Sequence, residues 1–233
     1  MKILVFAAHP DDCEIGMGGT IKKMSEKNHN IVVVDLTQGE MSSNGNVFKR
    51  QSEADNASKI LGIQNRENLM LPDRNIVGHI ENVKKIADVI RKHKPNIVFY
   101  PNYEDNHPDH KACSRLVKEG IFHSKLKKYQ SEYDAFTVKK SYRYQINGSA
   151  QFDYYIDVSD TYEYKIKALK AYSSQFDLQD QNSKTRLNSG FIAYLESRNR
   201  VCGFECGVEY AEGFITDSPL IFDTIDKWEA VSK

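Results

Sequence analysis

The chain has 233 residues, of which 40% are hydrophobic and 27% are charged, as in ordinary soluble globular proteins. Lys and Arg together number 32, and so do Asp and Glu, so no basic excess points to nucleic acid or to an anionic membrane as a partner. The length suffices for one large α/β domain with a buried core, and one domain over residues 1–233 is expected.

The first nine residues are mostly apolar, but they are too few to cross a membrane and show no signal-peptide cleavage pattern. We therefore expect a cytosolic protein. The four cysteines form no CxxC pair, which favours reduced, structural thiols over a zinc ribbon or a disulfide framework.

In chain order, residues 2–8 (KILVFAA) predict a buried strand, 14–28 a helix and 31–37 (IVVVDLT) a second buried strand. A strand, a helix and a strand in succession indicate a β-α-β unit. Two strands joined in this way lie parallel in one sheet, with a right-handed crossover.

The alternation continues with a helix over 49–62, a short strand over 67–71, a helix over 79–93 and a strand over 96–100. Residues 123–158 are β-rich, and helices are predicted over 160–172 and roughly 184–200. The pattern predicts a Rossmann-like, doubly wound, mostly parallel sheet with a C-terminal β-rich and helical elaboration.

Two of the predicted strands lead into clusters of ionisable residues. The first strand is followed by His-Pro-Asp-Asp at 9–12, and the strand over 96–100 is followed, after a short loop, by His-Pro-Asp-His at 107–110. Each cluster has ligand-type residues spaced i, i+3, which share one face of a helical first turn. Because open α/β sheets bind ligands beyond the carboxyl ends of their strands, the two clusters are expected to meet.

Zinc accepts histidine nitrogen and aspartate oxygen, and catalytic zinc sites use three protein ligands plus water. The two clusters supply such a set in His9, Asp12 and His110. A zinc ion, or another divalent metal, would also offset the repulsion among Asp11, Asp12 and Glu14. Asp11 is a candidate general base for the bound water. His107 is a candidate proton donor or oxyanion partner, braced by Asp109.

Other interpretations of these motifs stay open at this point. His-Pro and Asp-Pro pairs are common in turns, and a single such motif would indicate a turn. A structural metal site needs four protein ligands, and a nucleotide-binding module without catalysis predicts a GxGxxG turn, which the segment GMGGT does not supply. His29, His79, His93 and His123 are interpreted as surface or core residues.

The sequence resembles the LmbE/PIG-L family of zinc-dependent N-acetylglucosaminyl deacetylases over almost its full length. The resemblance rests on AHPDD, TQGEMSSNG, RQSEADNASKILG, LPDR, NYEDNHPDH, DVSDTYEYKIKALKAYSSQF and GVEYAEGF. The set is most similar to the bacillithiol-pathway branch, which deacetylates N-acetylglucosaminyl-malate.

The resemblance implies the same roles for the residues of the two motifs, and it places Arg50 at a position associated with substrate binding. Some relatives carry a proton-donating tyrosine two residues before the histidine of the second motif. Here that position is Asp105, which shifts the donor role toward His107. Cys13 stands where many relatives have an aliphatic residue.

The implied reaction is hydrolysis of the acetamide of a GlcNAc conjugate, with N-acetylglucosaminyl-malate as the first candidate. Another GlcNAc conjugate or a chitooligosaccharide is the alternative. Malate carries two carboxylates, which arginine binds through paired hydrogen bonds, so Arg50, Arg74 and Arg143 are candidate substrate-binding residues. Relatives form higher oligomers, so the resemblance also implies a homo-oligomer.

Overall fold

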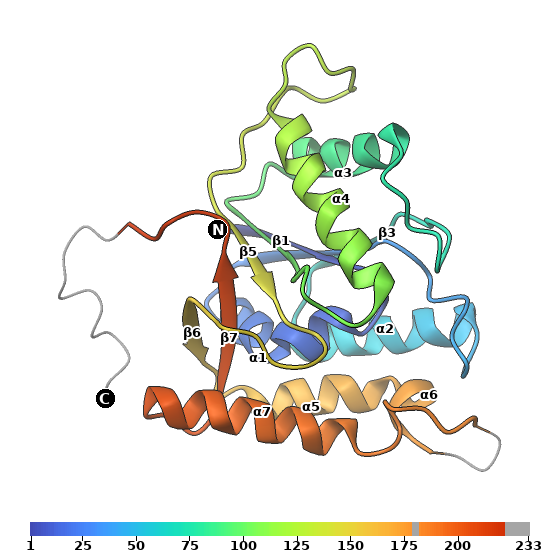
Figure 1. The fold of residues 1–233 in the computed structure, drawn as a ribbon, viewed down its shortest axis with the longest axis vertical. Helices are drawn as coiled ribbons and strands as arrows, with labels where there is room; N and C mark the ends of the chain where they lie inside the picture. Colours follow the sequence, from blue (N-terminus) through green and yellow to red (C-terminus); the bar gives the residue numbers. More distant parts are fainter. Residues whose placement is uncertain (179–181, 222–233) are drawn as a thin grey trace.

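The computed structural model describes residues 1–178 and 182–221. Its seven-stranded sheet has the order β3-β2-β1-β4-β5-β7-β6 (Figure 1). The first five strands in the chain pair in parallel, and β7 runs antiparallel between β5 and β6. The strands are β1 (Lys2–Ala7), β2 (Asn30–Asp35), β3 (Asn65–Asn68), β4 (Ile97–Pro101), β5 (Ser141–Tyr144), β6 (Tyr154–Asp157) and β7 (Ala211–Thr216).

Helices cover both faces of the sheet, because its central strands are apolar on both sides. In β1, Ile3 and Val5 face one hydrophobic core and Leu4 and Phe6 face the other. Figure 1 shows α3 and α4 on one face, α1 and α2 on the other, and α5 to α7 in an outer layer beyond them. The helices are α1 (Asp12–Glu26), α2 (Val47–Leu61), α3 (Ile80–His93), α4 (Pro108–Ser124), α5 (Tyr162–Ala171), α6 (Ser173–Phe176) and α7 (Phe191–Cys206).

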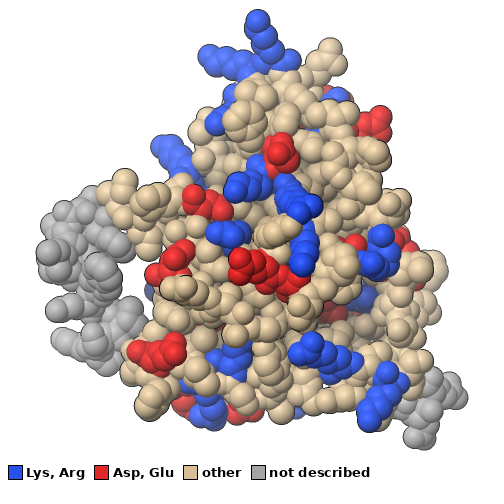
Figure 2. All heavy atoms as spheres, viewed as in Figure 1, with Lys and Arg blue, Asp and Glu red and all other residues tan. Residues whose placement is uncertain are grey.

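On the face seen in Figure 2, Lys and Arg side chains alternate with Asp and Glu, so the described part of that face carries no broad region of one sign. Among the described residues, no helix combines the length and the apolarity needed to cross a bilayer.

The predicted fold class is confirmed, and so is the order of strands and helices up to α4, with ends that differ from the predicted ones by at most three residues. All four cysteines are free thiols, as expected.

Two details of the C-terminal part differ from the prediction. Residues 187–190 form a turn, and the helix begins only at Phe191, after Gly190 adopts a left-handed backbone with φ of 98°. Strand β7 was not predicted, because the buried Glu212 interrupts the alternation of apolar and polar residues that is typical of a strand.

The strand order places a topological switch point beside β1. The chain adds β2 and β3 on one side of β1 and then crosses to form β4 on the other side. The connections that leave β1 and β4 therefore diverge to opposite faces of the sheet and open a crevice between their carboxyl ends. His9 follows β1 and His107 follows β4, so both motifs begin at this crevice.

A buried ion pair joins α1 to the C-terminal elaboration. Helix α1 is broken at Met17 (φ −149°, ψ 26°), and the Glu212 carboxylate accepts hydrogen bonds from the amides of Gly19 (3.1 Å) and Thr20 (2.7 Å) beyond the break. Lys165 of α5 donates to the same carboxylate at 2.6 Å, and neither side chain is exposed. Glu212 thus caps the second half of α1, and Lys165 compensates its charge.

Removing one partner of this pair leaves an uncompensated buried charge. Lys165→Met should therefore lower the free energy of unfolding by roughly 3–5 kcal/mol, measured by urea denaturation. The control is Lys167→Met on the same helix, where the exposed pair with Glu163 contributes little, so its urea midpoint should barely move. Equal midpoints for the two variants would contradict this account.

Candidate functional site

A cavity of about 430 Å³ opens at the crevice between β1 and β4. Its floor is formed by the two sequence motifs, through His9, Asp11, Asp12, His107 and His110. The opposite wall comes from the C-terminal elaboration and was not foreseen from the sequence. It includes Ile146, Asn147, Gln175, Thr185, Arg186 and Leu187.

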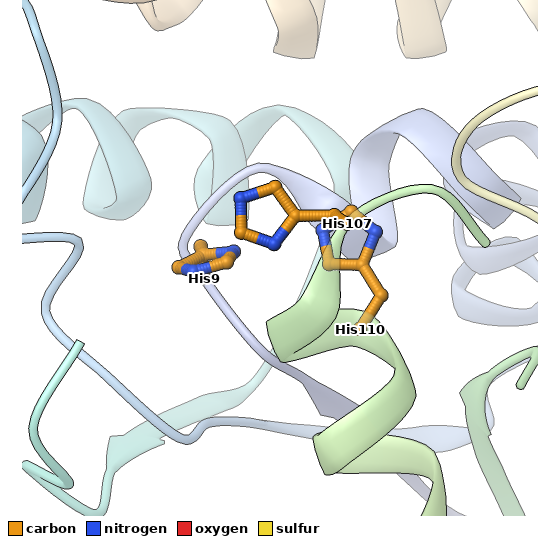
Figure 3. A group of neighbouring side chains, drawn as sticks. All are labelled: His9, His107 and His110. Carbon is orange, nitrogen blue, oxygen red and sulfur yellow. The ribbon is translucent and has the colours of Figure 1, made fainter. Parts of the chain in front are cut away.

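The structure brings the two motifs into contact, although about a hundred residues separate them. The imidazole centroid of His9 lies 4.9 Å from that of His107 and 5.6 Å from that of His110, and the last two stack at 4.6 Å (Figure 3). The Asp12 carboxylate lies between the motifs, with Oδ2 3.5 Å from His9 Nδ1 and Oδ1 3.1 Å from His110 Nε2. Three of the predicted residues, His9, Asp12 and His110, therefore share one buried centre.

The starts of helices α1 and α4 determine where the side chains of the two motifs lie. Helix α4 begins at Pro108, directly after His107, so His107 and His110 lie on its first turn as the spacing predicted. Helix α1 begins at Asp12, two residues later than the proline of its motif. Its N-cap residue, Asp11, has φ of 114°, a conformation that costs free energy for a residue with a Cβ and that clusters at functional sites.

The donor set fits a divalent transition metal. His9, Asp12 and His110 are each less than 10% exposed, and they offer the imidazole nitrogens and carboxylate oxygens that zinc binds. Two groups of described residues have ligand atoms that all lie within 4.8 Å of one another, namely His9, His107 and His110, and His9, Asp73 and Asp109. The predicted set of His9, Asp12 and His110 is not one of these groups, although Asp12 contacts both histidines. Burial disfavours the charged form of Asp12, but the nearby His110 outweighs this and holds the pKa of Asp12 well below its usual range.

His9 is held from outside the centre by two carboxylates. Its Nε2 lies 3.1 Å from Asp73 and 3.3 Å from Asp109. Burial opposes protonation of His9, but these contacts and the contact with Asp12 outweigh it and raise its pKa well above the usual value. Asp73 was not predicted as a site residue. The signals for it were its place after β3 and in the LPDR segment.

Asp109 contacts His107 differently from the expected brace. Its backbone amide donates to His107 Nδ1 at 3.2 Å, whereas its carboxylate faces His9 and Arg74. Because Nδ1 of His107 accepts this bond, the proton of the neutral ring is on Nε2. Burial and the neighbouring His110 and His9 lower the pKa of His107, which keeps the ring neutral and able to donate from Nε2.

Arg50 lies against the predicted general base. It is 4% exposed, and its guanidinium donates to the Asp11 carboxylate at 3.1 Å and to the carbonyl of Pro10. Burial raises the pKa of Asp11 to about 7, Arg50 opposes this, and Asp12 adds to it. A carboxylate with a pKa near neutrality is suited to take and return a proton. Arg50 also lines the cavity, so it contacts Asp11 and borders the space open to a ligand.

Of the other two candidate arginines, Arg74 lines the cavity and Arg143 does not. Arg74 lies at the cavity mouth, where its half-exposed side chain donates to Asp109 at 3.1 Å. Arg143 lies on β5, contacts Asn102 and Asp217, and is not among the residues that line the cavity.

Glu14 has its own cationic partner, contrary to the expectation that a metal offsets its charge. Arg66 donates to Glu14 at 2.6 Å and pairs with Asp35 through two hydrogen bonds of 2.6 and 2.9 Å. The Tyr172 hydroxyl donates to the Glu14 carboxylate at 3.0 Å. Glu14 is therefore neutralised by an arginine beneath the cavity floor and needs no metal.

Comparison with known proteins agrees with this geometry. The model of the PIG-L family, described as GlcNAc-PI de-N-acetylase, matches residues 4–121, which include both motifs. The chain belongs to the PIG-L family. This family includes the LmbE-type deacetylases of GlcNAc conjugates, so the chain has the fold and the motifs of a hydrolytic enzyme family.

The relatives of the chain are named for different substrates. The chain is 33% identical over 189 residues to a diacetylchitobiose deacetylase of Thermococcus kodakarensis, covering 75% of this chain and 70% of the relative. It is 27% identical over 209 residues to a probable N-acetyl-alpha-D-glucosaminyl L-malate deacetylase 2 of Bacillus subtilis, covering 82% and 91%. The crystal structure of the conserved protein TT1542 from Thermus thermophilus matches with a TM-score of 0.87 and 32% identity, covering 96% and 97%.

The contact between Arg50 and Asp11 predicts a change that can be measured on the metal-free protein. In Arg50→Met the positive charge that favours ionised Asp11 is lost, so the pKa of Asp11 should rise above its value of about 7. Carboxyl carbon NMR titration of chelator-treated protein reports this pKa. Arg186→Met, at the exposed cavity mouth, is the control and should leave it unchanged. An unchanged or lower pKa in Arg50→Met would show that Arg50 does not act on Asp11.

Proposed function

We propose that this protein is a metal-dependent hydrolase that removes the N-acetyl group of a GlcNAc conjugate, with N-acetylglucosaminyl-malate as its substrate. The observation that supports the proposal is the convergence of His9, Asp12 and His110, with Asp11 beside them at a pKa of about 7. Three ligand residues at the floor of an open cavity leave room for water and substrate, as in a catalytic rather than a structural site.

His9, Asp12 and His110 would hold the zinc, which when bound supplies a Lewis acid for the acetamide carbonyl and for water. Asp11 takes a proton from the attacking water as its oxygen forms a bond to the carbonyl carbon. Asp11 then returns the proton to the amide nitrogen as the carbon–nitrogen bond breaks, releasing acetic acid and the free amine, and the acid then ionises to acetate. Arg50 keeps the Asp11 carboxylate in place through both proton transfers.

His107 acts on the carbonyl oxygen. Its Nε2 carries the proton in the neutral ring, because the amide of Asp109 donates to Nδ1. A neutral donor that faces the cavity stabilises the negative charge that develops on the carbonyl oxygen in the transition state.

The cavity supports a sugar conjugate as the bound molecule. Its volume of about 430 Å³ lies in the range of small-molecule sites. Arg74 and the exposed Arg186 stand at its mouth, where they can bind the carboxylates of a malate aglycone. Arg143 has no place in this proposal, because it contacts Asn102 and Asp217 outside the cavity lining.

Diacetylchitobiose is the second candidate, favoured by the 33% identity to a deacetylase of that disaccharide. The two substrates differ in the charge of the group attached to GlcNAc, so acetate release from each separates them. We expect a higher kcat/KM for N-acetylglucosaminyl-malate. Arg74→Met should lower kcat/KM for this substrate by roughly tenfold or more beyond its effect on diacetylchitobiose, since a hydrogen bond to a charged group contributes about 1.5–3 kcal/mol. A preference for diacetylchitobiose, with Arg74→Met acting equally on both, would reject malate.

Two variants distinguish the general base from the metal ligands. Asp11→Asn should retain zinc but lower kcat by roughly 10²–10⁴, because the amide cannot accept the proton. His110→Ala should lose the metal as well as activity, because it removes one of three ligands. Acetate release and elemental analysis of both proteins check this. Full activity in Asp11→Asn, or stoichiometric zinc in His110→Ala, would reject the respective assignment.

A further inference from the structure

Asp105 lies in the connection between β4 and α4, outside the set of residues that the proposed reaction uses. It is 6% exposed and accepts hydrogen bonds from several directions. Its Oδ1 lies 3.0 Å from His110 Nδ1 and accepts from the amide of His107 at 2.8 Å and from Asn147 Nδ2 at 3.0 Å. Its Oδ2 accepts from the amide of Asn147 at 2.9 Å.

These contacts determine which nitrogen of His110 keeps a proton when the other binds a metal. An ionised carboxylate only accepts, so Nδ1 of His110 is the donor toward Asp105 at 3.0 Å. Nε2 points to Asp12, 3.1 Å away on the other side of the ring, and is the nitrogen that would bind the metal. The imidazole is held between two carboxylates, one outside the centre and one within it.

We infer that Asp105 is a positioning residue that orients His110 for the metal and strengthens its binding. The inference rests on the proposed function, because it assigns Asp105 to the metal centre of that function. A carboxylate that accepts from the outer nitrogen of a histidine ligand fixes the ring and raises the basicity of the nitrogen that binds.

The same contacts distinguish this role from proton donation. All the partners of Asp105 donate to it, and both of its oxygens are occupied, so it presents no proton to a substrate. It is also absent from the cavity lining, whereas its partner Asn147 is part of the wall. Asp105 therefore links Asn147, in the cavity wall that follows β5, to His110 on α4.

The test is zinc affinity of the full chain, measured by competition with a chromogenic chelator. Asp105→Asn keeps the size and one acceptor oxygen but loses the charge and the second acceptor. We expect its zinc dissociation constant to rise by roughly 10–100-fold. Asp153→Asn is the matched control, since Asp153 also accepts from a backbone amide and a hydroxyl, both of Thr216, at the β6–β7 edge. Its zinc affinity should equal that of the wild type.

Thermal unfolding of the metal-free proteins separates positioning from a purely structural role. A structural Asp105 would lower the melting temperature of the metal-free variant and leave the zinc affinity of the folded protein unchanged, which would overturn the inference. If Asp105→Asn does not fold, Asn147→Ala decides instead. It removes one donor to Asp105, so affinity should fall severalfold, and an unchanged affinity would again overturn the inference.

Failure of the inference and failure of the proposed function give different results. A wild-type chain that binds no zinc rejects the metal-dependent function and the role of Asp105 with it. A wild-type chain that binds zinc, beside an Asp105→Asn variant that binds it equally well, rejects the role of Asp105 alone.

Discussion

Charge compensation in a buried crevice is the constraint on which the site depends. Asp11, Asp12, Asp105 and Asp109 are all less than 10% exposed, and their charges would repel one another without partners. Each has a cationic or imidazole group within 3.5 Å, through Arg50, His9, His110 or Arg74. A divalent ion among His9, Asp12 and His110 would complete this compensation at the point where Asp12 meets two imidazoles.

A second layer of buried charges supports the first from below. Arg66 joins Glu14 at the start of α1 to Asp35 at the end of β2, and Tyr172 reaches Glu14 from the end of α5. Farther along α1, Glu212 and Lys165 tie the second half of the helix to β7 and α5. Because α1 carries Asp12 on its first turn, these contacts hold one half of the candidate metal site relative to the sheet.

The C-terminal elaboration completes the cavity as well as the core. Gln175 bonds to Ser42 and to the carbonyl of Asn44, which ties the end of α6 to the loop before α2. Ser42, Gln175 and Leu187 then form a wall across from the motifs. The two motifs thus lie on the doubly wound part of the chain, whereas the opposite wall of the cavity comes largely from segments that follow it.

The sequence alone determined the doubly wound α/β class, the order of its elements up to α4, and the two histidine motifs at strand ends, because apolar periodicity and short local spacings encode these features. Only the tertiary structure decided how the charges pair. It placed Arg50 on Asp11, Arg66 on Glu14, and Asp73 and Asp105 behind the two histidines. It also separated Arg143 from the cavity. Apart from Asp105, which lies five residues before His110, these partners are 39 to 64 residues apart and belong to no local pattern. They are therefore defined only when strands and helices pack and each buried charge must find an opposite one.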